Sequence, residues 1–371
     1  MSNARKLAAN LPTEGSLSGR NIVTNGGMNV NQRGNQTGLT ANTYTTDRFF
    51  FAISGRDELV CSIEQSTDVP SGSGFANSLK YTTTTPESSI ATDEYANIWQ
   101  KIEAQNLQHL AYGTSSAKKL TLSFWVKSSV TGTFCVGIYK DDTTGQIHNK
   151  TYTISSASTW EYKTITFEAN SLSGGAIANN NGIGVYLTWH LASGNNYDSG
   201  SSTSSGWANY STTNWCAPST TDAVITTTNA TFQLTGIQLE VGSQSTPFEH
   251  EPVGVTLDKC ERYFQTYSNR TWNGINEHAA NYKMFVNGVF RQKMRATPTG
   301  SFIGTVNVAT PQVGVTQRPN AFQGLSSEGW YFFKWPSSGT YGGSLGTHGD
   351  AKYYVTVGAG PTNRIDFDAE L

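Results

Sequence analysis

The sequence is poor in charge and has no long hydrophobic run. Charged residues make up only 14% of its 371 positions, and 25 basic side chains against 27 acidic ones give a formal net charge of −2. Without a basic excess or a block of like charge, the chain lacks the usual means of binding nucleic acid. No stretch approaches the roughly 20 apolar residues of a membrane span, so membrane insertion is not expected. The first ten residues include basic side chains but no apolar core, so we expect no secretory signal and synthesis in a cytoplasm.

Cysteine is also scarce. The four cysteines, Cys61, Cys135, Cys216 and Cys260, lie far apart and form no C-x-x-C pair. The six histidines show no H-x-H or H-E-x-x-H spacing. We therefore predict buried free thiols, with no disulfide framework, no metal site and no cofactor.

Glycine, serine, threonine and asparagine are abundant instead, and aromatic residues reach 12%. This composition is typical of β-structure. The segments Leu120–Val126 and Thr133–Tyr139 flank a short turn and are expected to pair as a hairpin, with Trp125 in the core. Further strands are predicted at 78–83, 162–168, 184–189, 231–241, 282–290, 302–308, 329–335, 351–357 and 364–367.

The chain is long enough for two folded domains. We predict an arm over residues 1–20, a strand-rich domain over 21–250, a helical connector over 251–268 and a second β-domain over 269–371. In the connector the apolar residues follow a 4-3-4-3 spacing, which places them on one face of a helix of about three turns; they are Val253, Leu257, Cys260, Phe264 and Tyr267. Two hypotheses stay open for this face. It packs against symmetry mates in an oligomer, or it covers the edge of a neighbouring sheet.

Several strings in the first domain carry a resemblance to known modules. Lys119–Ser129, Gly132–Tyr139 and Ser158–Phe167 resemble the family 4/9/22-like carbohydrate-binding modules. Asn21–Met28 and Phe232–Glu240 are similar to the first and last strands of such modules. The resemblance implies an all-β fold: a jelly-roll β-sandwich followed by the short helix and a second, smaller β-sandwich-like domain.

A narrower resemblance joins both domains. The segments that carry it are Asn25–Gly34, Thr46–Phe49, Ile237–Gly242, Thr246–Glu249, Cys260–Phe264, Met294–Thr299 and Asp368–Leu371. Together they resemble the jelly-roll modules of phage tail-fibre and minor structural proteins. The chain departs from the carbohydrate-binding pattern at Gly27, Asn29 and Gln238, which stand where acids often hold a structural calcium, and only Glu240 remains nearby. A calcium site is therefore not expected.

Aromatic residues are the best candidates for ligand binding, because an indole can stack on the apolar face of a sugar ring. Trp189, Trp207, Tyr210 and Trp215 flank or occupy a long polar segment between Trp189 and Ala223. These rings either contact a ligand or pin their own loop to the sandwich. In the second domain the Trp330–Trp335 run alternates as a strand with one buried face.

No sequence motif supports catalysis. Gly342–Gly346 fits G-x-S-x-G and precedes His348 and Asp350, but it lacks the apolar strand and the helix that a nucleophile elbow needs. The adjacent acids Asp141-Asp142 and Asp93-Glu94 are typical of solvated turns, since neighbouring residues on a strand point to opposite faces. We therefore expect a protein that is not an enzyme.

The residues and the resemblance together predict a phage virion protein, a tail fibre or spike. Its N-terminal arm would bind other virion proteins, and a homotrimer would contact host surface glycans through many weak, non-catalytic sites. The alternatives are a capsid decoration or tail-adaptor protein with a purely structural role, and a polysaccharide depolymerase.

Overall fold

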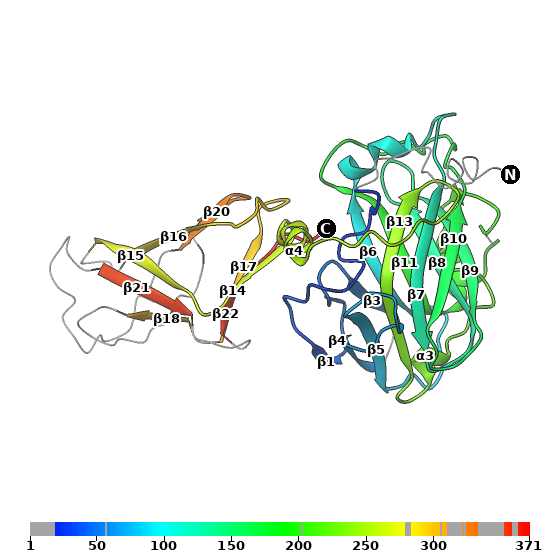
Figure 1. The fold of residues 1–371 in the computed structure, drawn as a ribbon, viewed down its shortest axis with the longest axis horizontal. Coiled ribbons are helices and arrows are strands. Elements are labelled where there is room, and N and C mark those ends of the chain that lie inside the picture. The colour runs from blue at the N-terminus through cyan, green and yellow to red at the C-terminus, as the bar shows by residue number, and fades with distance from the viewer. Residues whose placement is uncertain are drawn as a thin grey trace. The chain divides into compact units, whose positions relative to one another are not determined.

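The computed structural model describes residues 19–55, 58–201, 203–278, 283–304, 306–309, 322, 324–332, 352–357 and 363–371. The predicted arm therefore falls almost wholly outside the described residues. The chain divides into two compact units: unit 1 holds residues 1–256 together with Leu371, and unit 2 holds residues 257–370 (Figure 1). Every strand pair of both units is antiparallel among the described residues.

Unit 1 is a sandwich of two sheets. The first sheet, called sheet A, has the order β1 (Gln36–Leu39), β4 (Val60–Ser66), β5 (Ser78–Thr85), β13 (Thr231–Val241), β7 (Leu120–Ser128) and β10 (Glu161–Phe167). The second, sheet B, has the order β12 (Ala208–Asn209), β9 (Gln146–Ile154), β8 (Gly132–Lys140), β11 (Ile183–Ser193), β6 (Tyr95–Glu103), β3 (Phe50–Ser54) and β2 (Thr43–Tyr44). Short helical turns lie in the connections: η1 (Ala104–Leu110), α2 (Asn195–Asp198), η2 (Thr212–Asn214) and α3 (Ala223–Thr226).

The core of unit 1 lies between the two sheets. Alternate residues of each strand point into it, as the period of a strand requires. On β8 the inward side chains are Phe134, Val136 and Ile138, all fully buried. They belong to one continuous apolar cluster that draws on strands of both sheets. The all-β, jelly-roll fold class is confirmed.

The predicted hairpin of β7 and β8 is wrong. The strand β7 pairs with β10 and β13 in sheet A, whereas β8 pairs with β9 and β11 in sheet B. The short connection after Ser128 therefore crosses the sandwich, and Val130 within it packs against the core. Local alternation shows that each strand has one apolar face, but the same pattern suits two strands that face each other across a core and two that pair side by side.

The predicted core position of Trp125 is also wrong. On β7 the core residues are Leu122, Phe124 and Val126, so the intervening Trp125 points outward and is partly exposed. Its ring lies 5.2 Å from that of Tyr162 on the outer face of sheet A. The apolar run Phe124–Val126 obscured the alternation that places this indole outside.

Unit 2 contains two sheets. One has the order β14 (Phe264–Tyr267), β22 (Arg364–Asp368) and β17 (Thr299–Ile303). The other has the order β18 (Val306–Ala309), β21 (Lys352–Val357), β15 (Thr271–His278), β16 (Lys283–Val289), β20 (Gly329–Phe332) and β19 (Gly324–Leu325). Tyr267, Trp330 and Phe367 are among the buried residues of its core.

The helix α4 (Val253–Glu261) is shorter than the predicted helical connector. It ends at Glu261, and Phe264–Tyr267 forms β14, which pairs with β22. The pairing with Arg364–Asp368 is a contact of high sequence separation, so helical spacing alone could not reveal it. Cys260, Phe264 and Tyr267 are buried, and Leu257 is partly exposed. No helix among the described residues is long and apolar enough to cross a membrane.

Candidate functional site

The outer face of sheet B carries a row of aromatic side chains. The row runs over five neighbouring strands, from β2 through β3, β6 and β11 to β8. Its members are Tyr44, Phe50, Trp99, Tyr186 and Tyr139, which we call the aromatic row; each of them is partly exposed. A sheet surface lined by consecutive rings is an unusual use of large side chains that could otherwise fill the core.

Strand register explains why these rings share one face. Tyr44 lies opposite Phe50, and Phe50 lies opposite Trp99. Tyr186 lies opposite Tyr139 on β8. Directly opposed residues of antiparallel strands project to the same side. The intervening residues, such as Phe51 and Ile98, point into the core, so the row must point away from it.

The rings are close enough to form a continuous surface. Their centroids are 4.7 Å apart for Tyr44 and Phe50, and 5.5 Å apart for Phe50 and Trp99, whose planes are within 8° of parallel. Trp99 and Tyr186 are separated by 5.3 Å, and Tyr186 and Tyr139 by 5.5 Å. These spacings are typical of mutually stabilising aromatic pairs. The pairs hold each ring in a fixed orientation before any ligand arrives.

Cationic groups lie over the same rings. The Lys101 Nζ atom is 5.3 Å from the centroid of Phe50 and 5.6 Å from that of Tyr186. The Arg33 guanidinium lies 5.1 Å from the centroid of Tyr44. These distances permit cation–π attraction. Lys101 Nζ and the Tyr44 hydroxyl both donate to the Leu371 carbonyl oxygen, so both groups already have a hydrogen-bond partner.

Phenol groups on this face are held in the neutral form. Burial, and then the nearby Asp141, raise the pKa of Tyr139 and Tyr186 well above the usual value. The Tyr139 hydroxyl donates a hydrogen bond of 3.0 Å to the Asp141 carboxylate. At neutral pH both hydroxyl groups are therefore neutral, and the Tyr139 oxygen, whose proton goes to Asp141, can still accept a hydrogen bond.

The long segment between β11 and β13 folds onto this face. Its Trp215 ring packs 6.1 Å from Trp99 and 5.5 Å from Tyr139, and the side chain is only 7% exposed. The orientation of the Asn97 amide follows from its partners: Nδ2 donates to the Ala96 carbonyl at 2.8 Å, and Oδ1 accepts from Trp215 Nε1 at 3.0 Å. Trp215 therefore joins the loop to the sheet.

The four aromatic residues singled out in the sequence have different positions. Trp189 is fully buried in the core and packs 5.7 Å from Phe124, so its role as a ligand-binding residue is contradicted. It lies on β11, where alternation with Thr188 and His190 points it inward. Trp215 is buried under its loop, and Tyr210 is 37% exposed beside the row, with its ring 4.9 Å from Tyr139.

Trp207 pins the loop to the sandwich. Its Nε1 donates to the Glu168 carbonyl at 2.7 Å, and its ring lies 5.5 Å from Tyr112 and 5.8 Å from His148. We expect Trp207→Phe to lower the free energy of unfolding by about 1 kcal/mol, because the hydrogen bond is lost. Trp207→Ala should lower it by about 3 kcal/mol, because the ring contacts are lost as well. Urea unfolding measures both changes. Equal losses for the two variants would show that the hydrogen bond, not the ring, holds the loop.

The sequence did hold a signal for the missed residues. In β6, Tyr95, Asn97, Trp99 and Lys101 alternate with Ala96, Ile98 and Ile102. Strict alternation assigns Trp99 to the face opposite the isoleucines. The other members of the row lie on strands whose partners are distant in sequence, so only the folded register brings them together.

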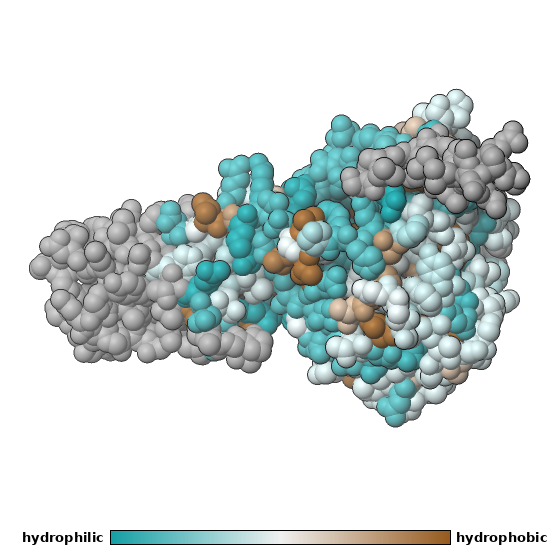
Figure 2. Space-filling view, viewed as in Figure 1, coloured by the Kyte–Doolittle hydropathy of each residue, from teal (hydrophilic) through white to brown (hydrophobic). Residues whose placement is uncertain are grey.

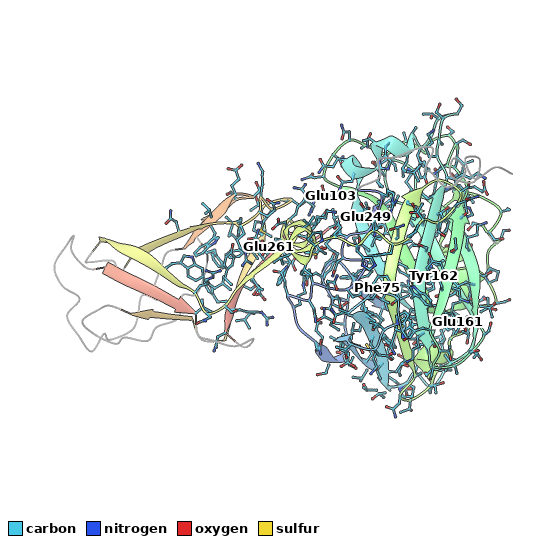
Figure 3. All side chains as sticks on the ribbon, viewed as in Figure 1. Phe75, Glu103, Glu161, Tyr162, Glu249 and Glu261 are labelled. Carbon is cyan, nitrogen blue, oxygen red and sulfur yellow. The ribbon has the colours of Figure 1, made fainter. Side chains whose placement is uncertain are left out.

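The outer face of sheet A carries its own aromatic group. Trp125 and Tyr162 lie together there, and Tyr162 is 45% exposed; Figure 3 labels Tyr162 and Phe75 on unit 1. The Asp68 carboxylate accepts hydrogen bonds from Lys127 at 2.7 Å and from Trp160 Nε1 at 3.1 Å. These rings are fewer, and no comparable row runs across sheet A among the described residues. Figure 2 shows a surface of unit 1 that is otherwise mostly hydrophilic or neutral, with scattered apolar spots.

Glu240 and Glu249, for which no role in calcium binding was expected, both accept hydrogen bonds. Glu240 accepts from the Thr246 N–H and from Gln238 Nε2, both at 2.8 Å. Glu249 accepts from the backbone N–H groups of Arg20 at 2.8 Å and Asn21 at 3.0 Å. These donors occupy oxygens that a cation would need.

The adjacent acids Asp93-Glu94 and Asp141-Asp142 lie between strands, but Glu94 is only 5% exposed, so the prediction that it is solvated is wrong. The Glu94 carboxylate accepts from the Ala91 N–H at 2.7 Å, within its own turn, and Asp142 accepts from Thr143 and the Ala178 N–H. The G-x-S-x-G segment at 342–346, with His348 and Asp350, lies outside the described residues.

No protein-family model matches the chain, and no curated protein matches it in sequence. Among solved structures, it is similar to the enzymatically active domain of bacteriophage CBA120 tailspike protein 4, at 13% identity and a TM-score of 0.33, over 60% of this chain and 21% of that one. It is also similar to a family 11 carbohydrate-binding module from Clostridium thermocellum, at 12% identity and a TM-score of 0.28, over 57% of this chain and 98% of that one. A third is a putative sugar-binding protein from Bacteroides thetaiotaomicron, at 8% identity and a TM-score of 0.32, over 60% of this chain and 100% of that one. The chain thus spans about a fifth of the tailspike chain's length. The fold described above rests on the chain's own strands.

Proposed function

We propose that the chain is a non-catalytic glycan-binding protein and that the aromatic row on sheet B is its binding face. The observation that carries the proposal is the continuity of the row over five strands, with every ring partly exposed and fixed by its neighbours. Pyranose rings have an apolar face of C–H groups that stacks on aromatic carbon. A row of rings therefore suits an extended oligosaccharide.

The polar groups around the row fit the rim of a sugar. Lys101 and Arg33 are strong donors placed against the rings, and the Tyr139 and Tyr186 hydroxyl groups are neutral. Sugar hydroxyl groups both donate and accept, so they can pair with either kind of partner. We infer that the ligand is a bacterial surface polysaccharide.

We further propose that the chain works as part of a phage virion, as a tail fibre or spike. The resemblance of segments such as Asn25–Gly34 and Ile237–Gly242 to phage tail-fibre and minor structural proteins supports this assignment. In that setting the N-terminal arm would bind other virion proteins, and a homotrimer would present three copies of the face. Repeated weak sites raise the overall avidity without any single tight site.

The test of glycan binding is a depletion assay. The full chain is mixed with polysaccharide purified from candidate host cells and immobilised on beads, and the unbound protein is measured. We expect saturable depletion that soluble polysaccharide reverses. No depletion by any polysaccharide from a host on which the phage grows would contradict the proposal.

Two further measurements separate the alternatives. Immunogold labelling of virions should place the chain on the tail, whereas a decoration protein would coat the capsid. A reducing-end assay on the bound polysaccharide should show no new ends over time. New ends would identify a depolymerase, and the non-catalytic part of the proposal would then be wrong.

A further inference from the structure

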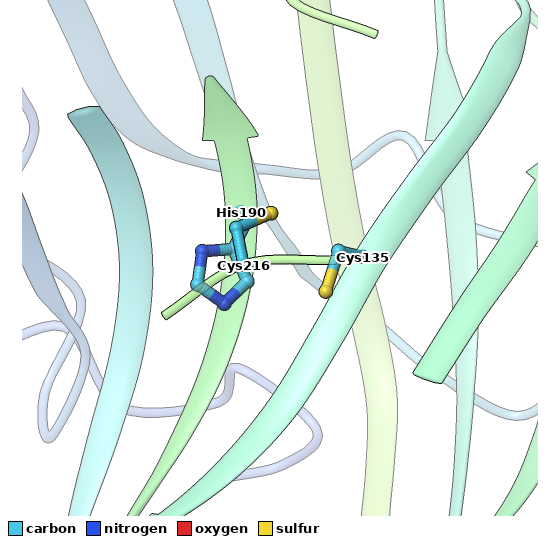
Figure 4. Close-up of side chains that lie close together, drawn as sticks. All are labelled: Cys135, His190 and Cys216. Atoms are coloured by element: carbon cyan, nitrogen blue, oxygen red, sulfur yellow. The ribbon is translucent and has the colours of Figure 1, made fainter. Parts of the chain in front are cut away.

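Two cysteines and a histidine converge beneath the long loop of unit 1. Cys135 on β8 and His190 on β11 are directly opposed across the sheet. Cys216 comes from the loop, 81 residues along the chain from Cys135. The ligand atoms of the three side chains all lie within 4.8 Å of one another, and the residues are 0%, 3% and 2% exposed in that order (Figure 4).

Hydrogen bonds to the main chain of residues 214–216 fix the position of Cys216. The Asn149 Nδ2 atom donates to the carbonyl oxygens of Asn214 at 2.9 Å and Trp215 at 3.1 Å. The N–H of Cys216 itself donates to the Tyr197 carbonyl at 2.9 Å. Since Cys135 and His190 sit on paired strands, all three ligands are held by elements that cannot move independently. A preformed set of this kind loses little entropy when it binds an ion.

We propose that Cys135, His190 and Cys216 bind one zinc ion. Thiolate and imidazole are the ligands that zinc takes in proteins, and they are poor ligands for calcium or magnesium. Binding converts two thiols to thiolates and releases two protons to solvent, so no oxidant or reductant is needed. The two thiolate charges balance the dication, which leaves a neutral centre in a buried site.

Zinc takes four ligands in a tetrahedron, and the cluster supplies three. An oxygen ligand completes it, either a water molecule or the Thr220 hydroxyl, whose Oγ1 lies 3.7 Å from Cys216 Sγ. A monovalent copper ion suits the same soft ligands, but it would leave one uncompensated negative charge at this buried position. The balance of charge therefore favours zinc.

The hydrogen bonds of His190 indicate which of its ring nitrogens is available to the metal. Asn97 Nδ2 donates to His190 Nδ1 at 3.0 Å, so in the metal-free chain the imidazole proton sits on Nε2. Zinc on Nε2 moves that proton to Nδ1, and Asn97 must then turn its oxygen toward the ring.

The first experiment measures metal content. The full chain is purified without chelators, dialysed against metal-free buffer and analysed by elemental mass spectrometry. We expect about one zinc per chain for the wild-type protein and none for Cys135→Ala and Cys216→Ala. The equally buried Cys61 and Cys260 supply matched controls, since Cys61→Ala and Cys260→Ala should keep their zinc.

A second readout does not depend on how the cysteine variants fold. Cobalt added to the metal-free wild-type chain should give thiolate-to-cobalt charge-transfer bands and the intense visible bands of a tetrahedral centre, and zinc should abolish both. The proposal is overturned if the wild-type chain takes up neither metal, if Cys135→Ala and Cys216→Ala retain zinc, or if peptide mapping finds a Cys135–Cys216 disulfide in the protein as purified. None of these readouts depends on whether the aromatic row binds a glycan.

Discussion

Trp99→Ala is expected to lower the affinity of the full chain for its polysaccharide at least tenfold. Trp99 is the largest ring of the aromatic row and lies at its centre, between Phe50 at 5.5 Å and Tyr186 at 5.3 Å. Its removal takes away one stacking surface and breaks the row into two parts. A central aromatic anchor typically contributes more than 1 kcal/mol to binding, and about 1.4 kcal/mol corresponds to tenfold in affinity. The depletion assay measures the change directly.

The chain offers a matched control for this variant. Trp125 is also a partly exposed tryptophan in the middle of a sheet, but it lies on the outer face of sheet A. Trp125→Ala should leave binding unchanged within twofold. If Trp125→Ala lost binding and Trp99→Ala kept it, the binding face would be sheet A and our assignment of the site would be wrong.

Acid should destabilise the wild-type chain more than His148→Phe. Burial lowers the pKa of His148 from 6.5 to about 4, and its side chain packs 5.3 Å from Phe167. Between those pH values the unfolded chain binds a proton that the folded chain does not, so the free energy of unfolding rises with pH in this window. As pH falls from about 6.5 to 4, the wild-type chain should therefore lose about 3 kcal/mol relative to the variant. Urea unfolding across this pH range measures the difference.

Asp222 supplies a control of opposite sign. Burial raises the pKa of its carboxyl from 3.8 to about 6, and Oδ1 accepts from the Ser193 N–H at 3.1 Å. Here the folded chain binds the extra proton, so the contribution of Asp222 to stability is present at low pH and is lost as pH rises through 6. Asp222→Asn keeps the acceptor oxygen and removes the titration. The wild-type chain should thus weaken relative to this variant as pH increases. A difference of the same sign for both variants would contradict the assignment of the two groups.

The fold was partly predictable, because the local alternation of apolar and polar residues identifies individual strands. Thr231–Val241 was predicted as a strand with the bounds that the structure shows. The pairing of strands was not predictable in the same way, since β7 and β8 have the pattern of a hairpin and belong to different sheets. The helix α4 was found, but Phe264–Tyr267 became a strand because a partner about 100 residues away completes its hydrogen bonds.

The candidate site was less predictable than the fold, because it is made by register. Trp189 and Trp99 both lie in apolar strands. Alternate residues of a strand point to opposite faces, and the position of each tryptophan in this alternation places Trp189 in the core and Trp99 on the outer face. The cluster of Cys135, His190 and Cys216 has no sequence spacing that a motif could capture. Only the cross-strand pair of Cys135 and His190, with the loop folded above it, brings the three side chains together.

The most direct test of the central claim is an NMR titration of the full chain with a soluble polysaccharide that depletes it. The chain has nine tryptophans, and each indole N–H gives its own signal. We predict that the Trp99 signal shifts with the saturation of binding, while those of Trp125 and Trp160 stay in place. Shifts confined to Trp125 and Trp160, with Trp99 unchanged, would contradict the account.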